Sequence, residues 1–272
     1  MSSVTPAFFT AEGDHFVPQR EAANPWFDHA VAGGPISGLF GHIAEQRGLI
    51  GEGFAISRMT IDILGIVPSA PLTATIEPVR IGRQVRLNRI NLKHDNHVVA
   101  QALVQAARLL DTPPALPSNG YPAPEDVAPG TFLANGSLQR IVRTRPLQGS
   151  VTRPGPGQVW LALDADIVSG TLASPFVKSC VFADFGNGVG SATRAAEWSF
   201  ANLDVGIHFL RDPHGEWILV DADTIAGGNG HGLARSTMVD AEGVFAIATQ
   251  TVFVAPGSLT PRMEANARSA VG

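Results

Sequence analysis

Three polar residues lie in the C-terminal part of the sequence where the strand pattern favours apolar ones. Asp204 opens the run LDVGIHFL, Thr224 ends the run EWILVDADT, and Gln250 interrupts the run VFAIATQTVFV. Strands are depleted in Asp, and a polar group inside a half-buried sheet must find a partner. A carboxylate, a hydroxyl and an amide supply donors and acceptors together, so we predict that these three side chains hold a water molecule.

The strands that would position these residues follow one another between residues 203 and 254. Apolar runs containing Val, Ile, Phe and Trp are separated by the turn sequences RDPHG, GGNG and DAEG, which predicts an antiparallel meander of four strands. Strand alternation places Asp204 on one face together with Gly206 and His208, and this face is less apolar than the other.

Two segments marked by glycine and proline are predicted to be helices, near residues 34–48 and 175–188. In the first, apolar residues recur at spacings of three and four, Gly33 and Gly34 precede the repeat, and Pro35 suits a first turn. Gly38 and Gly41 of this helix have no side chain, which predicts that another element packs closely against it. We expect this element to be a sheet wrapped around the helix. The second begins with Ser174 as an N-cap and Pro175 at the first helical position.

Each predicted helix is followed by a run of strands, so the same architecture occurs twice along the chain. The first set comprises four extended runs, at residues 54–64, 71–82, 83–94 and 97–110. Two further strands are expected before the second helix, at residues 138–145 and 158–165. The predicted organisation is an N-terminal unit at 1–110, a proline-rich linker at 111–130 that favours an extended, exposed path, a C-terminal unit at 131–256, and a disordered tail at 257–272.

Composition excludes several classes of protein. The net charge of −5 is scattered along the chain, so we expect neither nucleic acid nor a membrane as a partner. No signal peptide is recognisable, and the single cysteine, Cys180, excludes an intramolecular disulfide and a cysteine metal cluster, so we expect a cytoplasmic protein. We expect no cofactor or metal, because no His, Asp or Glu cluster has ligand spacing and the sequence GNGVG ends a helix instead of following a strand.

One helix followed by a meander long enough to wrap it, present twice, resembles the double hot-dog fold. This is an α+β fold with two antiparallel sheets, each wrapped around one long helix. The segments ANLDVGIHFLRDPHGEWILVDADT, HGLARSTMVDAEG, ATQTVFV and VFADFGNGVGS are similar to the C-terminal half of the bacterial acyl-CoA thioesterase II family. HAVAGGPISG and SRMTIDILGIVP resemble the N-terminal half of that family.

The resemblance implies hydrolysis of an acyl-CoA thioester by a water that an Asp, a Thr or Ser, and a Gln activate, without a covalent intermediate. On the matching segments these roles fall to Asp204, Gln250 and either Thr224 or, without a gap, Ile225, of which Thr224 carries the required hydroxyl. The backbone N–H groups at Gly33 and Gly34 could hold the developing oxyanion, since the first turn of a helix has unpaired donors. A homo-oligomer is expected, because hot-dog sheets leave an edge or a helix-free face exposed.

Several alternatives stay open at the level of sequence. Asp204 could instead cap a loop, Gln250 could bind backbone, and Gly33-Gly34 could be a simple tight turn. Asp184 on the second helix is another candidate acid or base. A dehydratase or hydratase of hot-dog type would pair His29 or His42 with Asp184. A third alternative is a non-catalytic acyl-binding protein that has lost the catalytic geometry.

Overall fold

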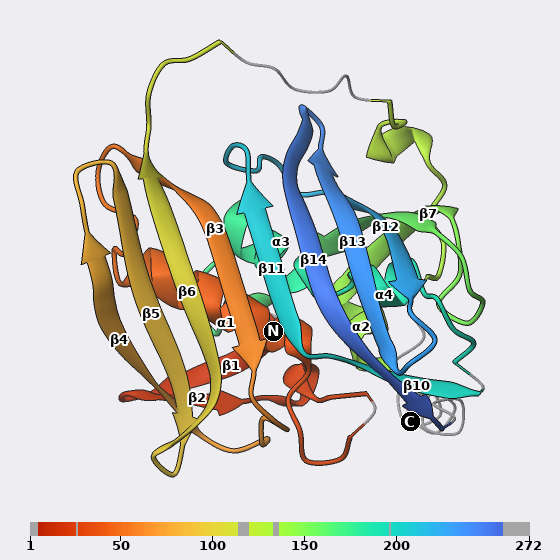
Figure 1. Ribbon diagram of the computed structural model, residues 1–272, viewed down its shortest axis with the longest axis horizontal. Helices are drawn as coiled ribbons and strands as arrows, with labels where there is room; N and C mark the ends of the chain where they lie inside the picture. The colour runs from red at the N-terminus through yellow and green to blue at the C-terminus, as the bar shows by residue number, and fades with distance from the viewer. Residues whose placement is uncertain (1–4, 26, 114–119, 133–135, 196, 258–272) are drawn as a thin grey trace.

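A single 14-stranded sheet organises the protein (Figure 1). The structure is a computed structural model of the 272-residue chain and describes residues 5–25, 27–113, 120–132, 136–195 and 197–257. The strand order is β7-β8-β12-β13-β14-β11-β3-β6-β5-β4-β2-β1-β9, with β10 paired to β14. The predicted tail at 257–272 lies outside the described residues except for Gly257.

The strands predicted before and after the proline-rich stretch are confirmed. The earlier ones are β3 (Phe54–Ile63), β4 (Leu72–Ile81), β5 (Val85–His94) and β6 (His97–Arg108), preceded by β1 (Ala7–Glu12) and β2 (His15–Pro18). The later ones are β7 (Val142–Gln148), β8 (Gly157–Leu163), β9 (Asp166–Val168), β10 (Trp198–Asn202), β11 (Asp204–Phe209), β12 (Ile218–Ala226), β13 (His231–Asp240) and β14 (Gly243–Pro256). The strand expected at 138–145 begins as a helix, because α2 (Gly136–Ile141) occupies its first residues.

The strands of the two predicted units form one continuous sheet through the pair β3 and β11. This pair is antiparallel, with Asp204 opposite Asp62 and Ile207 opposite Met59. The opposite ends of the strand order are linked by the chain itself, because β8 continues into β9, which pairs with β1. The β1–β9 pair is parallel, so the expectation of a purely antiparallel arrangement is wrong at this point.

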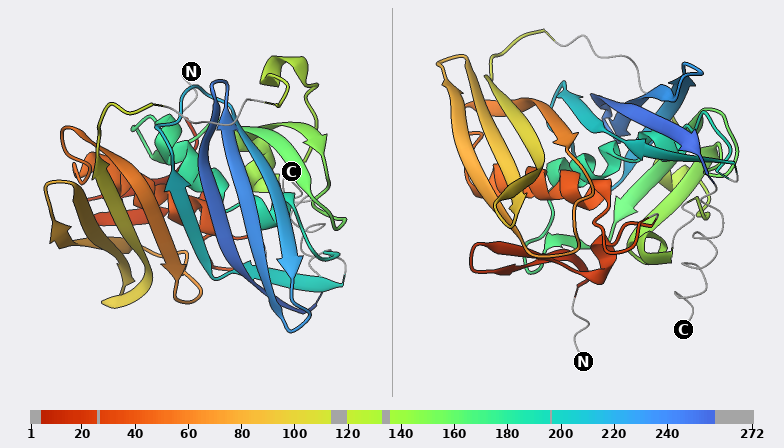
Figure 2. Two further views of the ribbon diagram at one scale, coloured as in Figure 1. Left: turned by 45° about the horizontal axis from the view of Figure 1, so that its top comes forward. Right: turned by 60° about the horizontal axis from the view of Figure 1, so that its bottom comes forward.

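The sheet encloses the helices α1 (Gly33–Gln46) and α3 (Pro175–Ala183). Figure 1 shows both helices behind the strands, and the right-hand view of Figure 2 shows α1 between β4–β6 and the β1–β2 hairpin. Their inward residues form the main hydrophobic core with the buried face of the sheet, including Ile36, Phe40 and Phe182. In the described part of the chain, no helix has the length and apolar character needed to span a membrane.

The close neighbour of the bare face of α1 is helix α3 and not the sheet alone, which corrects the expectation. A Cβ atom on Gly41 would lie 3.0 Å from Sγ of Cys180, and one on Gly38 would lie 2.6 Å from a methyl of Val181. The absent side chains therefore let the two helices approach closely.

The predicted second helix is interrupted. The segment 175–188 forms α3 and a separate short helix, α4 (Gly186–Val189), with Asp184 and Phe185 between them. The expectation of one long helix in each half is therefore correct for α1 and wrong for the second half.

Residues 111–113 and 120–130 of the proline-rich stretch form no strand of the sheet, and the segment at 120–130 is bonded to it. The Tyr121 hydroxyl donates to Asp221 at 2.5 Å, and the Trp160 indole N–H donates to the Pro122 carbonyl at 3.1 Å. A second, smaller apolar cluster lies below this segment, formed by Val127 with Trp160, Leu219, Val239 and Val244. The segment therefore covers apolar side chains on the outer face of β8, β12 and β13.

Helix α4 lies so close to β8 that Gly157 has no room for a side chain. A Cβ atom there would overlap the carbonyl oxygen of Val189. We expect Gly157→Ala to lower the free energy of unfolding by about 1–3 kcal/mol, because backbone must move to relieve the overlap. Gly188→Ala, whose Cβ meets no atom within 4 Å, is the matched control in α4. Urea titration measures both, and equal stability of Gly157→Ala and wild type would contradict this account of the packing.

Candidate functional site

The interruption between α3 and α4 places the Asp184 carboxylate beside the start of α1 and the end of β10. Asp184 has φ −74° and ψ −12°, and its N–H donates to the Val181 carbonyl three residues back. The N–H of Asn187 is bonded outside the helix, because it donates to Oε1 of Gln250 at 2.8 Å. The break therefore joins Asp184, Asn187 and Gln250 into one local structure.

The Asp184 carboxylate lies between a strand and the start of α1. Nδ2 of Asn202, the last residue of β10, donates to Oδ1 of Asp184 and to its backbone carbonyl, each at 3.0 Å. On the other side, a Cβ atom on Gly33 would overlap the carboxylate oxygens, so only glycine permits this approach. A residue from β10 and the first turn of α1 thus hold one side chain in place.

Burial shifts the pKa of this carboxylate into the range of a base that works near neutral pH. It raises the pKa of Asp184 to about 7, although hydrogen bonds from the Asn202 side chain and the Gly34 backbone act to lower it. Both protonation states are therefore populated near pH 7, the range in which proton transfer to and from a side chain is most efficient.

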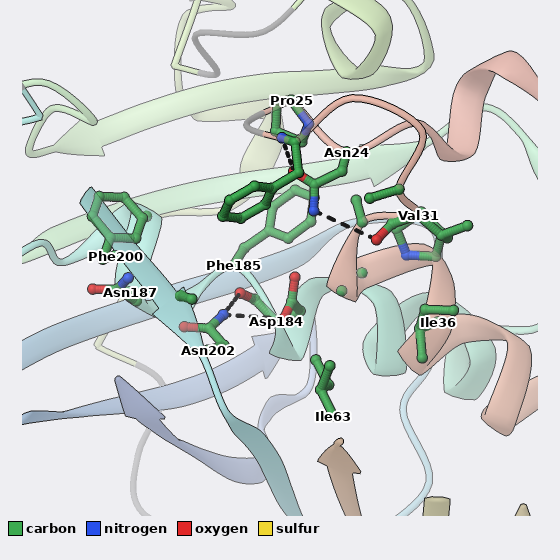
Figure 3. Close-up of a pocket in the computed structure, with 18 of the residues that line it drawn as sticks. Asn24, Pro25, Val31, Ile36, Ile63, Asp184, Phe185, Asn187, Phe200 and Asn202 are labelled. Carbon is green, nitrogen blue, oxygen red and sulfur yellow. Dashed lines mark hydrogen bonds between the residues drawn. The ribbon is translucent and has the colours of Figure 1, made fainter. Parts of the chain in front are cut away.

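Asp184 opens onto a cavity of about 390 Å³. Figure 3 shows Asp184 among the residues that line it, with its hydrogen bonds from Asn202. Polar side chains on the wall come from Asn24, Asp184, Asn187 and Asn202, and the backbone of Gly33 and Gly34 also contributes. The rest is mainly apolar, including Val31, Ile36, Ile63, Phe132, Leu138 and Phe200. An apolar cavity with a few converging polar groups is the usual form of a small-molecule site.

Two of the predicted site residues, Gln250 and Thr224, share the buried face of the sheet. Thr224 is opposite Ala234 on β13, and Ala234 is opposite Gln250 on β14, so all three side chains point to the same side. Gln250 is 1% exposed, and its Oε1 binds backbone, which was one of the alternatives. The Thr224 hydroxyl is buried, has no hydrogen-bond partner among the described residues, and is not part of the cavity wall.

The structure does not bring Asp204 together with these two residues, and the predicted geometry is wrong here. Gly206 lies opposite Thr249, so Val205 falls opposite Gln250 and Asp204 opposite Thr251. Successive side chains of a strand point to opposite faces, hence Asp204 points away from Gln250. Its carboxylate accepts from the N–H of Thr251 at 2.6 Å and from the Thr251 hydroxyl at 2.9 Å.

The histidine pairings of a dehydratase are not formed. His29 lies at an exposed position in the left-handed region with φ 58°, and His42 is buried in α1, where burial lowers its pKa. Neither residue is on the wall of the cavity that holds Asp184. Within the described ranges, no group of three or more His, Cys, Asp or Glu side chains could hold a metal ion.

Asn187 and Asn202 are the site residues that the sequence interpretation did not single out. Asn202 directly precedes the run LDVGIHFL, and Asn187 follows Asp184 by three residues. The sequence signal for Asn202 was a polar residue on the apolar face of a strand, and the signal for Asn187 was a polar residue one helical turn from a carboxylate. Only the fold shows that β10 and α4 meet at the same cavity.

Family comparisons match both parts of the chain. A family model described as the acyl-CoA thioesterase N-terminal domain matches residues 22–107. A second, described as the acyl-CoA thioesterase C-terminal domain, matches residues 113–254. No curated protein sequence matches the chain.

Solved structures of similar fold come from several bacteria. A tesB protein of Mycobacterium avium subspecies paratuberculosis is 16% identical with a TM-score of 0.64, covering 91% of this chain and 96% of its own. A protein of unknown function with hot dog fold from Alicyclobacillus acidocaldarius is 16% identical with a TM-score of 0.66, covering 91% and 95%. The acyl-CoA thioesterase II TesB2 of Mycobacterium marinum is 16% identical with a TM-score of 0.63, covering 92% and 94%. At this identity the likeness shows a shared hot-dog fold.

Proposed function

Because the chain belongs to the acyl-CoA thioesterase family and is a thioester hydrolase, we propose that it cleaves acyl-CoA with water activated by Asp184. The observation that carries this assignment is the half-buried carboxylate with a pKa of about 7 on the wall of an apolar cavity. Asp184 thereby replaces Asp204 as the proposed base, since the Asp204 carboxylate is bound to Thr251 on the other face of the sheet.

The proposed reaction needs one water and one base. The water oxygen attacks the thioester carbonyl carbon while a water proton passes to the Asp184 carboxylate, which gives a tetrahedral oxyanion. Collapse of this species breaks the carbon–sulfur bond, and the departing thiolate of CoA takes the proton back from Asp184. The products are the free acid and CoA. A cysteine nucleophile is not part of the proposal, because burial raises the pKa of Cys180, which lies away from the cavity wall.

The neighbouring residues take supporting roles in this proposal. Asn202 donates through Nδ2 to Asp184 and thereby orients the carboxylate that faces the water. The backbone at Gly33 and Gly34 lies beside the carboxylate at the start of α1, where N–H groups can stabilise negative charge. Gln250 supports the site through its bond to Asn187, and a role for the Thr224 hydroxyl stays a prediction.

The finer description of the fold is likewise proposed. We infer a double hot-dog in which units at 1–110 and 131–256, joined by the linker at 111–130, share one sheet through β3 and β11. The matches of an N-terminal and a C-terminal domain model to 22–107 and 113–254 support this division. The homo-oligomer expected from the sequence also stays a prediction.

Release of CoA from a chain-length panel of acyl-CoAs tests the function directly. We expect free thiol to appear stoichiometrically with free acid for at least part of the panel. Change in the acyl chain without thiol release would identify a dehydratase or hydratase. Binding without any reaction would identify a non-catalytic acyl-binding protein.

The pH profile of kcat/KM tests the base. Only the ionised form of Asp184 accepts a proton, and its pKa is raised to about 7, so kcat/KM should be constant above that pH. Below it, kcat/KM should fall about tenfold per pH unit, because each unit reduces the ionised fraction of a single carboxyl by that factor. A profile that stays flat down to pH 5 would contradict the assignment of Asp184.

A further inference from the structure

We propose that the substrates are medium-chain acyl-CoAs, with up to about ten acyl carbons, and that Phe132 sets this limit by closing the inner end of the cavity. This inference rests on the proposed function, which it extends from acyl-CoA in general to one class of acyl chain. Phe132 is then a specificity-determining residue, because it meets the end of the chain and not the reacting atoms.

The cavity has an exposed part and a buried part. Phe27, Ile66 and Leu203 line the exposed part, and they are 43%, 66% and 45% exposed. The Asp184 carboxylate lies near this part, since its partner Asn202 directly precedes Leu203 in the chain. Other apolar residues of the wall are at most 8% exposed and form the buried part: Val31, Ile36, Phe132, Leu138 and Val189.

The charge of CoA fixes the direction in which an acyl-CoA can enter. Its phosphate groups are costly to take out of water without a cation beside them. Among the described residues, no Lys, Arg or His lines the cavity. The phosphates therefore stay in solvent beyond the exposed part, and the thioester lies at Asp184. The acyl chain extends into the buried part, where its methylene groups leave water.

The segment that carries Phe132 and Leu138 lies across the cavity from Asp184. Figure 3 shows Asp184 on one side of the cavity and Asn24 on the other. Helix α2, which carries Leu138, packs against the 3-10 helix η1 (Arg20–Ala22) just before Asn24. A chain that leaves Asp184 and crosses the cavity therefore runs toward this segment.

Phe132 closes the cavity on that side. It is 6% exposed, belongs to the main hydrophobic core and lines the cavity of Asp184. It also lines a second pocket of about 550 Å³, whose wall contains Gln139, Arg143 and Arg145. Among the described residues, Phe132 is the only one that the two walls share. It thus separates an apolar space from a polar one, so a shorter side chain here extends the apolar cavity toward open space and not toward packed side chains.

The volume of the cavity limits the length of the chain. A methylene group takes up about as much space as a water molecule in the liquid, roughly 30 Å³, so the 390 Å³ of the cavity hold about a dozen such groups. The thioester sulfur and oxygen and the attacking water fill part of this space, which leaves room for about ten acyl carbons.

The chain-length profile of wild type is the first part of the test. Thiol release is measured for straight-chain acyl-CoAs from butyryl-CoA to palmitoyl-CoA. We expect kcat/KM to rise about fourfold with each methylene that becomes buried and to peak near decanoyl-CoA. It should fall about tenfold or more by myristoyl-CoA, whose chain exceeds the cavity. An optimum at palmitoyl-CoA, or rates independent of chain length, would overturn the proposal.

Phe132→Ala is the second part of the test. Loss of the phenyl ring should move the optimum about two to four carbons higher, because the wall relaxes only in part into the space that the ring leaves. Hydrolysis of butyryl-CoA should stay close to wild type, because its chain ends before Phe132. A merely structural role of Phe132 would instead lower the rate for every chain alike. Phe132→Leu should shift the optimum in the same direction by less, and it serves if the alanine variant does not fold.

Phe209→Leu is the matched control for Phe132→Leu. Phe209 is 9% exposed in the same core but is not part of the cavity wall, so its replacement should leave the optimum unchanged. Thiol release with the wild-type optimum in the folded Phe132 variants would overturn the proposal and leave the proposed function intact. Absence of thiol release by wild type from every acyl-CoA of the panel would overturn both.

Discussion

Asp184→Asn should reduce turnover of acyl-CoA by a factor of about 10²–10⁴, the usual contribution of a general base. The substitution preserves the shape of the side chain and removes the charge that accepts the proton of the attacking water. Binding of a stable substrate analogue, the ketone in which a methylene replaces the sulfur, should change little, because the apolar wall of the cavity remains. Steady-state kinetics and isothermal titration calorimetry measure the two effects separately.

The matched control is Asp204→Asn, which makes the same chemical change on the outer face of the sheet. It weakens the contacts of Asp204 with Thr251 and leaves the cavity intact, so turnover should stay within about twofold of wild type. A reversal of the two results, with Asp184→Asn active and Asp204→Asn inactive, would return the base to the position expected from sequence.

Asp184→Asn should be more stable than wild type at alkaline pH. Because the pKa of Asp184 is raised from 3.8 to about 7 on folding, the folded protein binds more protons than the unfolded chain between these values. Stability due to this group therefore falls as pH rises through that window, and the full penalty is present above pH 7. Asp184→Asn removes the penalty, so its Tm should exceed that of wild type at pH 8 and approach it near pH 4.

Asp240→Ala should destabilise the fold by about 3 kcal/mol, or roughly 5–10 °C in Tm. The Asp240 side chain is 0% exposed and accepts two hydrogen bonds from Arg211, at 2.8 and 2.5 Å. It also accepts from the N–H groups of His214 and Glu242, each at 2.8 Å. Removing the carboxylate leaves a partly buried guanidinium and two backbone donors without their partner.

The pH dependence of this effect distinguishes lost charge from lost packing. Burial alone would raise the pKa of Asp240, but the hydrogen bonds from Arg211 and the two N–H groups outweigh it and hold the pKa below its ordinary value. Its contribution is therefore present above pH 4 and lost at lower pH, so the gap in Tm should narrow there. Glu242→Gln, at a largely exposed position 4.0 Å from Arg211, should change stability by less than about 1 kcal/mol. If Glu242→Gln lowered the stability as much as Asp240→Ala, the buried pairing of Asp240 would not be the cause of the loss.

Local sequence signals sufficed for most of the strands and for α1. Alternating apolar residues bounded by Asp95-Asn96 predicted the β5–β6 hairpin, and both turn residues have the positive φ of 46° and 65° that such a turn needs. The break after α3 was not predictable in this way. It depends on the bond from Asn187 to Gln250, two residues far apart in sequence.

The candidate site was predicted less well, and strand alternation explains why. Asp204 shares a face with Gly206 and His208, and the small, polar character of these neighbours indicates the solvent side of the sheet. Gln250 alternates with Ala246 and Ala248, which are fully buried. Strand alternation, which was used to suggest the site, therefore places Asp204 and Gln250 on opposite faces of the sheet. Asp184 was visible only as an alternative, because its importance depends on burial that a sequence does not display.

The seam between β3 and β11 also has a consequence for synthesis on the ribosome. Strand β3 ends at Ile63, whereas its partner β11 begins only at Asp204. At roughly 5–20 residues per second, on the order of ten seconds pass before the partner strand emerges. During that interval the nascent chain can pair β3 with β6 on one side and presents an open strand edge on the other. The rate of translation between β3 and β11 thus sets how long the unfinished protein is exposed to strand addition by other chains. A chain truncated between these two strands keeps that edge open permanently.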